Sequence, residues 1–312
     1  MSLDVVTLGE AMALFVAGET GPLEQVRHFE KRTAGAETNV AVGIARLGLG
    51  MGWISRLGDD SMGRFLIGEF TREGIDCSHV AVVAGAKTGF MFKGRVDDGS
   101  DPPIEYHRKG SAASQMAATD LDLPWLAQAR HLHVTGIFPA LTPDTLAATR
   151  AAMAQMRAQG RTISFDPNLR PALWPCKDTM RTTLNGLAAH ADWVLPGLEE
   201  GRQLTGQSTA EGVAAFYRGL GARLVVVKLG VDGAYFDGEA GCGHVPAFPV
   251  ARVVDTVGAG DGFAVGVISG LLDGRTVPDA VRRAAWIGAR AVQVRGDTEG
   301  LPTRAELVAA GV

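Results

Sequence analysis

A glycine-rich segment towards the C-terminal end of the chain combines a possible anion site with a single acid. The segment reads VVDTVGAGDGFAVGVISGLL, and the apolar residues after its glycines recur at the spacing of a helix. The N–H groups at such a helix start are free and the helix dipole is positive there, so anions bind. Gly258, Ala259 and Gly260 can therefore stabilise a transferring phosphoryl group, while Asp261 accepts a proton from an attacking hydroxyl. A tight turn followed by a favourable helix-end charge is the simpler alternative.

The elements that would position this segment follow a βαβ rhythm. Short β-rich runs recur about thirty residues apart, at residues 131–135, 162–166, 192–195 and 224–229. The residues between them carry helix signals, such as Thr142 as an N-cap, Pro143 at the first helical position and Gly160 as a stop. The apolar run RLVVVKLG is typical of a parallel strand buried on both faces. We expect an α/β fold with a mostly parallel central sheet and helical crossovers.

The loops that follow these runs are candidate binding segments, because ligands of open α/β sheets bind beyond the carboxyl ends of the strands. In chain order the loops contain Ile137, the sequence Asp-Pro-Asn-Leu followed by Arg170, then Glu200, and finally Gly230 and Gly233. We expect Ile137 to contact the substrate. Every βα loop uses such residues for turns, however, and turn formation alone explains each loop taken singly.

Two segments, 11–33 and 88–109, interrupt the βαβ rhythm. The second contains TGFMFKGRVDDGSDPPIEYHRK and shows strand-like alternation on both sides of a turn around Asp98-Gly99 and Pro102-Pro103. We predict a β-hairpin with a long loop, and we expect the two segments to form a small β-sheet lid. The α/β core would then consist of residues 1–10, 34–87 and 110–312.

Composition argues against several classes of protein. The net charge of -4 is unsuited to nucleic-acid binding, which needs a concentrated basic surface. No apolar run approaches the roughly 18 residues that span a bilayer, and no basic region precedes an apolar run at the N-terminus, so we expect a cytoplasmic protein. The three cysteines form no CxxC pair, which predicts neither disulfides nor a zinc site. The 41 glycines, nearly twice the usual usage of about 7%, indicate many tight turns or close ligand contacts.

Two familiar nucleotide-binding patterns are absent. No GxxxxGK[ST] loop occurs, and Gly48, Gly50 and Gly52 end a helical pattern instead of opening one, which argues against dinucleotide binding. His131 and His133 share one face of a predicted strand without a carboxylate or cysteine at ligand spacing, which favours packing over metal binding.

The motifs AGAETNVAVGIARLG and DTVGAGDGF resemble the paired signatures of the ribokinase-like, or PfkB, carbohydrate kinases. The segments RLGDDSMGRFLIGEFTREGID and RGDTEGLPTRAEL are similar as well, so the resemblance covers the whole chain. It implies a three-layer α/β sandwich with a β-sheet lid that closes over a sugar and often joins two subunits into a dimer. It also implies ATP and Mg²⁺ as cofactors.

The same resemblance assigns roles at the reaction centre. Asp261 matches the family's catalytic base, and residues 258–260 match its anion hole. Gly35 and Asn39, in the first motif, match positions that contact the sugar.

For the nucleotide, the resemblance points to Lys228, Gly230 and Gly233, together with Gly260 of the anion hole, as residues along the phosphates and ribose. Glu200 matches the acid that organises water around magnesium, although Gly197 stands where the family usually has an asparagine.

Three features resemble the subgroup of 2-keto-3-deoxygluconate kinases. The segment EYHRKGSAAS, with Tyr106 and Arg108, is similar to a substrate-contacting segment of these enzymes. Arg170 falls where they hold the substrate carboxylate, and a guanidinium pairs bidentately with such a group. The stretch Gly9-Glu10-Ala11-Met12 lacks the additional Asp with which kinases of neutral sugars grip vicinal hydroxyls. Met91 replaces a frequent lid tyrosine, which leaves the epimer 2-keto-3-deoxygalactonate open.

We therefore expect an ATP-dependent kinase that phosphorylates the terminal hydroxyl of 2-keto-3-deoxygluconate. A kinase for a neutral sugar such as fructose or ribose is the alternative within the same class. A noncatalytic sugar or nucleotide sensor with the same fold is the alternative from another class, and the presence of Asp261 beside an intact glycine loop argues against it. A nicotinamide dehydrogenase is a further alternative.

Overall fold

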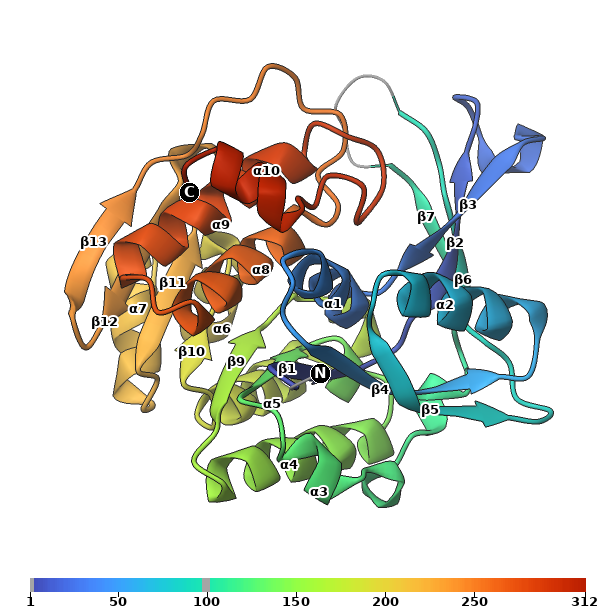
Figure 1. The fold of residues 1–312 in the computed structure, drawn as a ribbon, viewed down its shortest axis with the longest axis horizontal. Helices are drawn as coiled ribbons and strands as arrows, with labels where there is room; N and C mark the ends of the chain where they lie inside the picture. Colours follow the sequence, from blue (N-terminus) through green and yellow to red (C-terminus); the bar gives the residue numbers. More distant parts are fainter. Residues whose placement is uncertain (1–2, 97–101) are drawn as a thin grey trace.

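Two β-sheets organise the part of the chain that the computed structural model describes, residues 3–96 and 102–312. Sheet A has nine strands and lies between two layers of helices, and sheet B has four strands and projects from one side of the core (Figure 1). The layered arrangement confirms the predicted α/β class with a mostly parallel central sheet and a small second sheet.

Sheet A is parallel over most of its width. Its strands, in the order in which they lie side by side, are β13 (Gly241–Val245), β12 (Ala234–Gly238), β11 (Leu224–Lys228), β10 (Trp193–Val194), β9 (Thr162–Asp166), β8 (His131–Thr135), β1 (Val5–Leu8), β4 (Met51–Gly58) and β5 (Asp76–Val83). The strands from β11 to β5 pair in parallel, whereas β12 and β13 form an antiparallel edge. All four predicted strand runs are present, although β10 is shorter than predicted; the antiparallel edge was not predicted.

The helices of the described residues begin and end as follows: α1 (Ala36–Arg46), α2 (Ser61–Arg72), α3 (Leu123–Leu126), α4 (Pro143–Ala158), α5 (Lys177–Ala188), α6 (Leu198–Thr205), α7 (Ala210–Gly219), α8 (Ala259–Leu272), α9 (Val277–Ala291) and α10 (Arg304–Ala309). The predicted start of α4 is confirmed, because the Thr142 side chain accepts a hydrogen bond from the Thr145 N–H at 3.2 Å. Gly160 follows the helix with a φ of 64°, as expected for a stop. None of these helices is long and apolar enough to cross a bilayer.

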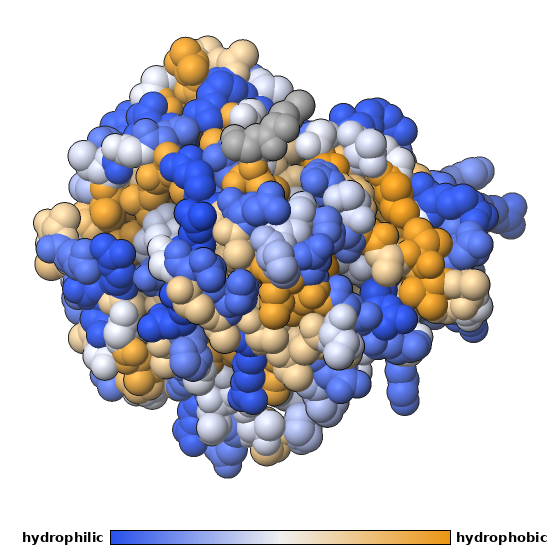
Figure 2. Space-filling view, turned by 60° about the horizontal axis from the view of Figure 1, so that its bottom comes forward, coloured by the Kyte–Doolittle hydropathy of each residue, from blue (hydrophilic) through white to orange (hydrophobic). Residues whose placement is uncertain are grey.

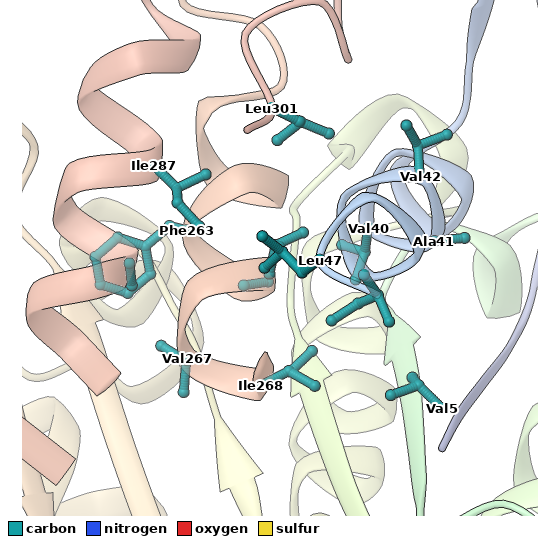
Figure 3. Packing of buried hydrophobic residues seen from close by; sticks show 14 of the residues in the cluster. Val5, Val40, Ala41, Val42, Leu47, Phe263, Val267, Ile268, Ile287 and Leu301 are labelled. Atoms are coloured by element: carbon teal, nitrogen blue, oxygen red, sulfur yellow. The ribbon is translucent and has the colours of Figure 1, made fainter. Parts of the chain in front are cut away.

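Two apolar cores cover the two faces of sheet A. In β11, Leu224 and Val226 pack into one core and Val225 and Val227 into the other, which explains the continuous apolar sequence of this strand. The first core includes side chains of α1, α2, α8 and α9, and Figure 3 shows Phe263, Val267 and other side chains of α8 between α9 and α1. The second core includes side chains of α4, α5, α6 and α7.

Helices α8 and α9 approach each other closely at two of the glycines of α8, Gly266 and Gly270. A Cβ atom at Gly266 would lie 2.5 Å from the backbone nitrogen of Ala284, and one at Gly270 would lie 2.7 Å from the Cα atom of Ala280. Part of the glycine excess therefore serves helix packing and not ligand binding.

Sheet B joins two segments that are far apart in the sequence. It contains β3 (Phe29–Ala34), β2 (Met12–Ala17), β6 (Phe90–Lys93) and β7 (Ile104–His107), in this order across the sheet. Strands β6 and β7 pair antiparallel, which confirms the predicted hairpin, while the predicted Asp98-Gly99 turn lies outside the described residues. Strand β2 pairs in parallel with β6 and thereby brings the two segments together.

Candidate active site

A cavity of 460 Å³ lies where the carboxyl ends of the sheet A strands meet the N-terminal ends of α1 and α8 and the strands of sheet B. Most of the predicted site residues line it, namely Gly35, Asn39, Tyr106, Arg108, Ile137, Arg170, Glu200, Lys228, Gly258, Gly260 and Asp261. Ala259, Gly230 and Gly233 are not part of the lining. Residues from three of the four predicted βα loops therefore line the cavity. The fourth loop, with Gly230 and Gly233, does not, but the strand before it contributes its last residue, Lys228.

Helix α8 begins at the cavity, at a glycine that a larger residue would strain. Gly258 has a φ of 81° and is the N-cap of the helix. A Cβ atom at this position would lie 3.1 Å from the Cα atom of Asp297. The N–H groups of the first helical turn have no acceptor within the helix and lie at the positive end of its dipole. The predicted helix start is confirmed. Gly258 and Gly260 line the cavity, whereas the Ala259 N–H donates to the Thr256 carbonyl oxygen at 3.4 Å, so the end of the helix that faces the cavity is suited to an anion.

Asp261 lies in this first turn and is only 8% exposed. Its Oδ2 accepts a hydrogen bond from Asn39 Nδ2 at 2.7 Å, and its Oδ1 lies 3.4 Å from Asn168 Nδ2. Burial raises the pKa of Asp261 from 3.8 to about 8, Asn39 acts in the opposite direction, and the carboxylate of Asp166 adds to the rise. A carboxylate with a pKa near the working pH is suited to accept a proton from a hydroxyl.

Asn39 contacts the acid, which sequence reasoning did not anticipate. While its Nδ2 donates to Asp261, its Oδ1 is buried and has no hydrogen-bond partner among the described residues. Gly35 is the N-cap of α1 with a φ of 141°, and a Cβ atom there would lie 2.6 Å from the carbonyl oxygen of Glu10. The backbone at Gly35 thus comes close to the cavity, and Asn39 has one acceptor to offer.

Lys228 ends β11 and forms an ion pair with Asp166, the last residue of β9, with 2.7 Å between Nζ and Oδ2. Burial acts against the charged ammonium, but Asp166 and Glu200 outweigh it and raise the pKa of Lys228 above its ordinary value. The lysine therefore carries its positive charge at the edge of the cavity, where phosphate groups would benefit from it.

Glu200 connects two of the βα loops. Its Oε1 accepts a hydrogen bond from the Leu169 N–H at 2.7 Å, and its Oε2 accepts one from the Gly197 N–H at 2.7 Å. The asparagine that the family usually has at position 197 would contribute an amide, and here only the backbone N–H of Gly197 is used. Glu200 fixes the loop that carries Arg170 and also lines the cavity.

The end of the cavity near sheet B holds a buried ion pair. Glu10 is 2% exposed, and Arg108 donates to its Oε2 through Nε at 2.6 Å and Nη2 at 2.5 Å. The Ser111 hydroxyl donates to the other carboxylate oxygen of Glu10. Arg108 therefore already has a carboxylate partner. Met91 is buried and lines the same end of the cavity.

Arg170 and Tyr106 are less constrained. Arg170 is exposed and its Nη1 donates to the carbonyl oxygen of Leu169 at 2.8 Å, and no carboxylate pairs with it within the described part of the chain. Tyr106 is 47% exposed, and the Arg108 guanidinium lies 5.9 Å from the centre of its ring. Of the two predicted carboxylate partners, only Arg170 has a guanidinium without an acidic partner.

Several acids at the cavity were not selected from the sequence: Glu10, Glu37, Asp166 and Asp297. Glu37 is buried and accepts a hydrogen bond from the Thr135 hydroxyl at 2.6 Å, and burial raises its pKa. The position of Glu10 two residues after β1 and of Asp166 at the end of β9 was a usable signal. Asp297 follows no strand, and only the tertiary structure brings it to the cavity.

The two histidines of β8 are packed in the sheet. His131 and His133 are both buried and both contact the Ser164 hydroxyl at 2.8 Å, and burial lowers the pKa of His133 to about 3. This confirms the predicted packing role. Across residues 3–96 and 102–312, no cluster of three or more His, Cys, Asp or Glu side chains forms a metal site.

Comparisons with known proteins agree with this geometry. The model of the pfkB family carbohydrate kinases matches residues 2–304. The chain is 51% identical over 308 residues to 2-dehydro-3-deoxygluconokinase of Bacillus subtilis (strain 168), an alignment that covers 98% of this chain and 95% of that protein.

Solved structures show the same fold. A PfkB protein from Polaromonas sp. JS666 is 65% identical with a TM-score of 0.92, covering 98% of this chain and 99% of that one. An E. coli protein solved in complex with ATP and Mg²⁺ is 28% identical with a TM-score of 0.90, covering 98% of each chain. The chain described here belongs to the PfkB family of carbohydrate kinases.

Proposed function

We propose that this kinase transfers the γ-phosphoryl group of ATP to the terminal hydroxyl of 2-keto-3-deoxygluconate, which is also called 2-dehydro-3-deoxygluconate. The observation that carries the proposal is the placement of Asp261, a buried acid with a raised pKa, in the first turn of a helix whose N-terminus suits phosphate, at a cavity that Arg108 and Arg170 also line. The name of the Bacillus subtilis relative supports the choice of substrate.

The reaction would use groups that the cavity already contains. Asp261 accepts the proton of the attacking hydroxyl, whose oxygen then bonds to the γ-phosphorus as the bond to the leaving ADP oxygen breaks. The amides at residues 258–260 stabilise the charge on the transferring group. Asn39 holds Asp261 through Nδ2, and its unpaired Oδ1 is an acceptor for a substrate hydroxyl.

For the substrate carboxylate we propose Arg170 as the main partner. Its guanidinium is exposed at the cavity without an acidic partner among the described residues, and an arginine–carboxylate pair can form two parallel hydrogen bonds. The charge of Arg108 is already balanced by Glu10, so Arg108 would orient the substrate without being the main partner of its carboxylate. Gly35, Tyr106 and the backbone near Ile137 would complete the sugar site.

ATP and Mg²⁺ fit the other end of the cavity. The amides of α8 and the ammonium of Lys228 suit the phosphates, and Gly230 and Gly233 lie beyond this lysine along the chain. Glu200 and Asp166 line the cavity but already accept hydrogen bonds, so they suit an ion held mostly by phosphates and water. Bound Mg²⁺ would neutralise charge on the phosphates and fix their orientation.

We further propose that segments 11–33 and 88–109 act as a lid and that the outer face of sheet B joins two copies of the chain into a dimer. Phe15, Phe29, Phe90 and Phe92 contact one another on this sheet and are only half-buried. Figure 2 shows an orange, hydrophobic band on the side of the molecule where sheet B lies.

The three free thiols fit a reducing compartment, so we propose that the enzyme is cytoplasmic.

An ADP-release assay with a panel of acceptors tests the proposed function. We expect turnover with 2-keto-3-deoxygluconate, with its galactonate epimer as the second candidate, and little turnover with fructose or ribose. A preference for the neutral sugars would contradict the role of Arg170. Binding of ATP without turnover of any acceptor would favour the noncatalytic sensor.

A further inference from the structure

A buried lysine connects sheet B to the core. Lys93 is the last residue of β6 and is 2% exposed. Its Nζ lies 2.6 Å from Asp255 Oδ2 and 3.3 Å from Asp297 Oδ1, and both carboxylates are buried as well. These three residues, here called the Lys93 cluster, join one strand of sheet B to two separate segments of the core.

Both acids of the cluster contact the loop that forms the anion hole. Asp255 Oδ1 accepts a hydrogen bond from the Val257 N–H at 3.1 Å, directly before Gly258. Asp255 Oδ2 also accepts one from the Gly296 N–H at 3.3 Å, which ties the loop to residues 296–297. Asp297 in turn lies against Gly258, so closely that a Cβ atom at Gly258 would be 3.1 Å from its Cα atom. The Asp255 carboxylate and the Asp297 backbone therefore both lie against the segment that leads into α8.

The ammonium holds together two acids that would otherwise repel each other. Burial raises the pKa of Asp297 and the neighbouring Asp255 adds to the rise, whereas Lys93 acts in the opposite direction. Two buried carboxylates without a cation are costly and would separate or draw in water. Lys93 itself is absent from the lining of the 460 Å³ cavity, while Asp297 is part of it, so the lysine acts on the site through its partners.

We propose that Lys93 is a positioning residue that couples sheet B to the anion hole: its ammonium holds Asp255 and Asp297 in place and thereby fixes the first turn of α8. Movement of sheet B, which contributes Tyr106 and Met91 to the lining of the cavity, would be transmitted to the start of α8 through this buried contact. The kinetic part of this inference rests on the proposed function; the structural part does not.

Hydrogen exchange on the ligand-free protein tests the structural part. We expect Lys93→Met to increase exchange of the amides in residues 256–262 by about tenfold or more, because their fixed partners are lost. Lys31→Met is the matched control: Lys31 also lies on sheet B and contacts the core, 4.1 Å from the centre of the Phe65 ring, but away from the anion hole. Unchanged exchange at 256–262 in Lys93→Met, or an equal increase in Lys31→Met, would overturn the proposal.

Steady-state kinetics test the coupling, using ATP and the acceptor that the wild type turns over best. We expect Lys93→Met to lower kcat by about tenfold or more, since the amides that stabilise the transferring group are misplaced, and Lys31→Met to change it by less than about twofold. A higher KM with wild-type kcat in Lys93→Met would overturn the positioning role. If the wild type turned over no acceptor, the proposed function would fail while the exchange result still decided the structural part.

Two further variants keep the test valid if Lys93→Met does not fold. Lys93→Met combined with Asp255→Asn removes one positive and one negative charge, and we expect it to fold with the same faster exchange at 256–262. Lys93→Ala leaves space for a small cation beside an existing cavity of 20 Å³, so methylammonium should restore turnover in part and tetramethylammonium should not. Wild-type exchange in the double variant, or equal effects of both cations, would contradict the role of the ammonium.

Discussion

Replacing Asp261 by asparagine tests two properties of the same group, its role as a base and its raised pKa. Asparagine has nearly the shape of a protonated aspartic acid and can still accept the hydrogen bond from Asn39. Turnover should fall by about 10² to 10⁴-fold, the usual contribution of a general base. The fold should persist, because the substitution removes no apolar contact.

The size of the stability effect follows from the pKa of Asp261. A rise from 3.8 to about 8 corresponds to about 5 to 6 kcal/mol at 1.36 kcal/mol per pKa unit. Because Asp261 holds its proton more tightly in the folded state, the folded protein binds more protons than the unfolded chain at pH values between these two pKa values. Wild-type stability must therefore fall as the pH rises through this window. Between pH 5 and pH 8 the loss amounts to about 3 to 4 kcal/mol, and Asp261→Asn avoids it.

Urea unfolding at pH 5, 6, 7 and 8 measures this difference directly. The free energy of unfolding of Asp261→Asn minus that of the wild type should increase steadily with pH. Asp144→Asn is the matched control, since Asp144 also lies in the first turn of a helix but is exposed. A difference that stays constant within about 1 kcal/mol from pH 5 to pH 8 would refute the reasoning, whatever the variant does to turnover.

Three other predictions concern the cavity. In steady-state assays, Arg170→Gln should raise KM for the sugar acid by about 10 to 100-fold, because a charged hydrogen bond is lost. The control Arg161→Gln, at the opposite end of β9, should leave KM unchanged. Equal effects of the two substitutions would contradict the carboxylate site. Gly258→Ala should lower the free energy of unfolding in urea by about 1 to 3 kcal/mol and should also lower kcat. The reason is that φ at Gly258 is 81° and that the Asp297 backbone fills the space for a side chain. Wild-type stability and kcat would argue against a constrained anion hole. The kcat/KM of the wild type should rise with pH up to about 8 as Asp261 loses its proton in the free enzyme, and a flat profile between pH 6 and pH 8 would exclude it as the base.

What could be predicted from the sequence depended on how local each feature is. The residues from Gly258 to Asp261 are consecutive and open a helix, so one short motif contained both the proposed anion hole and the proposed base. Thr142 and Gly160 mark the bounds of α4 for the same reason. These signals depend on the neighbouring residues alone.

Features that depend on distant contacts were missed. Strand alternation predicted β6 and placed Lys93 on it, but the pairing of Lys93 with Asp255 joins residues 162 positions apart. The pair of Arg108 with Glu10 spans 98 positions, and the sequence therefore suggested two free arginines where the structure has one. The edge hairpin of β12 and β13 has short strands with glycine at several positions, which gave no clear strand pattern.

The charge balance of the cavity affects how it would accept the two anionic substrates proposed for it. Acids outnumber bases in its lining: the acids are Glu10, Glu37, Asp166, Glu200, Asp261 and Asp297, and the bases are Arg108, Arg170 and Lys228. A cavity of this composition would repel ATP and a sugar acid if every acid were charged and unpaired.

Each of these acids is compensated in a different way. Glu10 and Asp166 each pair with one base of the lining, Glu200 accepts two backbone N–H groups, and Asp297 pairs with the buried Lys93. Burial favours the neutral form of the remaining two acids. The positive groups left for ligands are then Arg170 and the N-terminus of α8, which both line the cavity. Under the proposed function these two groups would bind the sugar carboxylate and the phosphates, respectively. The nucleotide would gain from a cation of its own, since the charge of Lys228 is already balanced by Asp166.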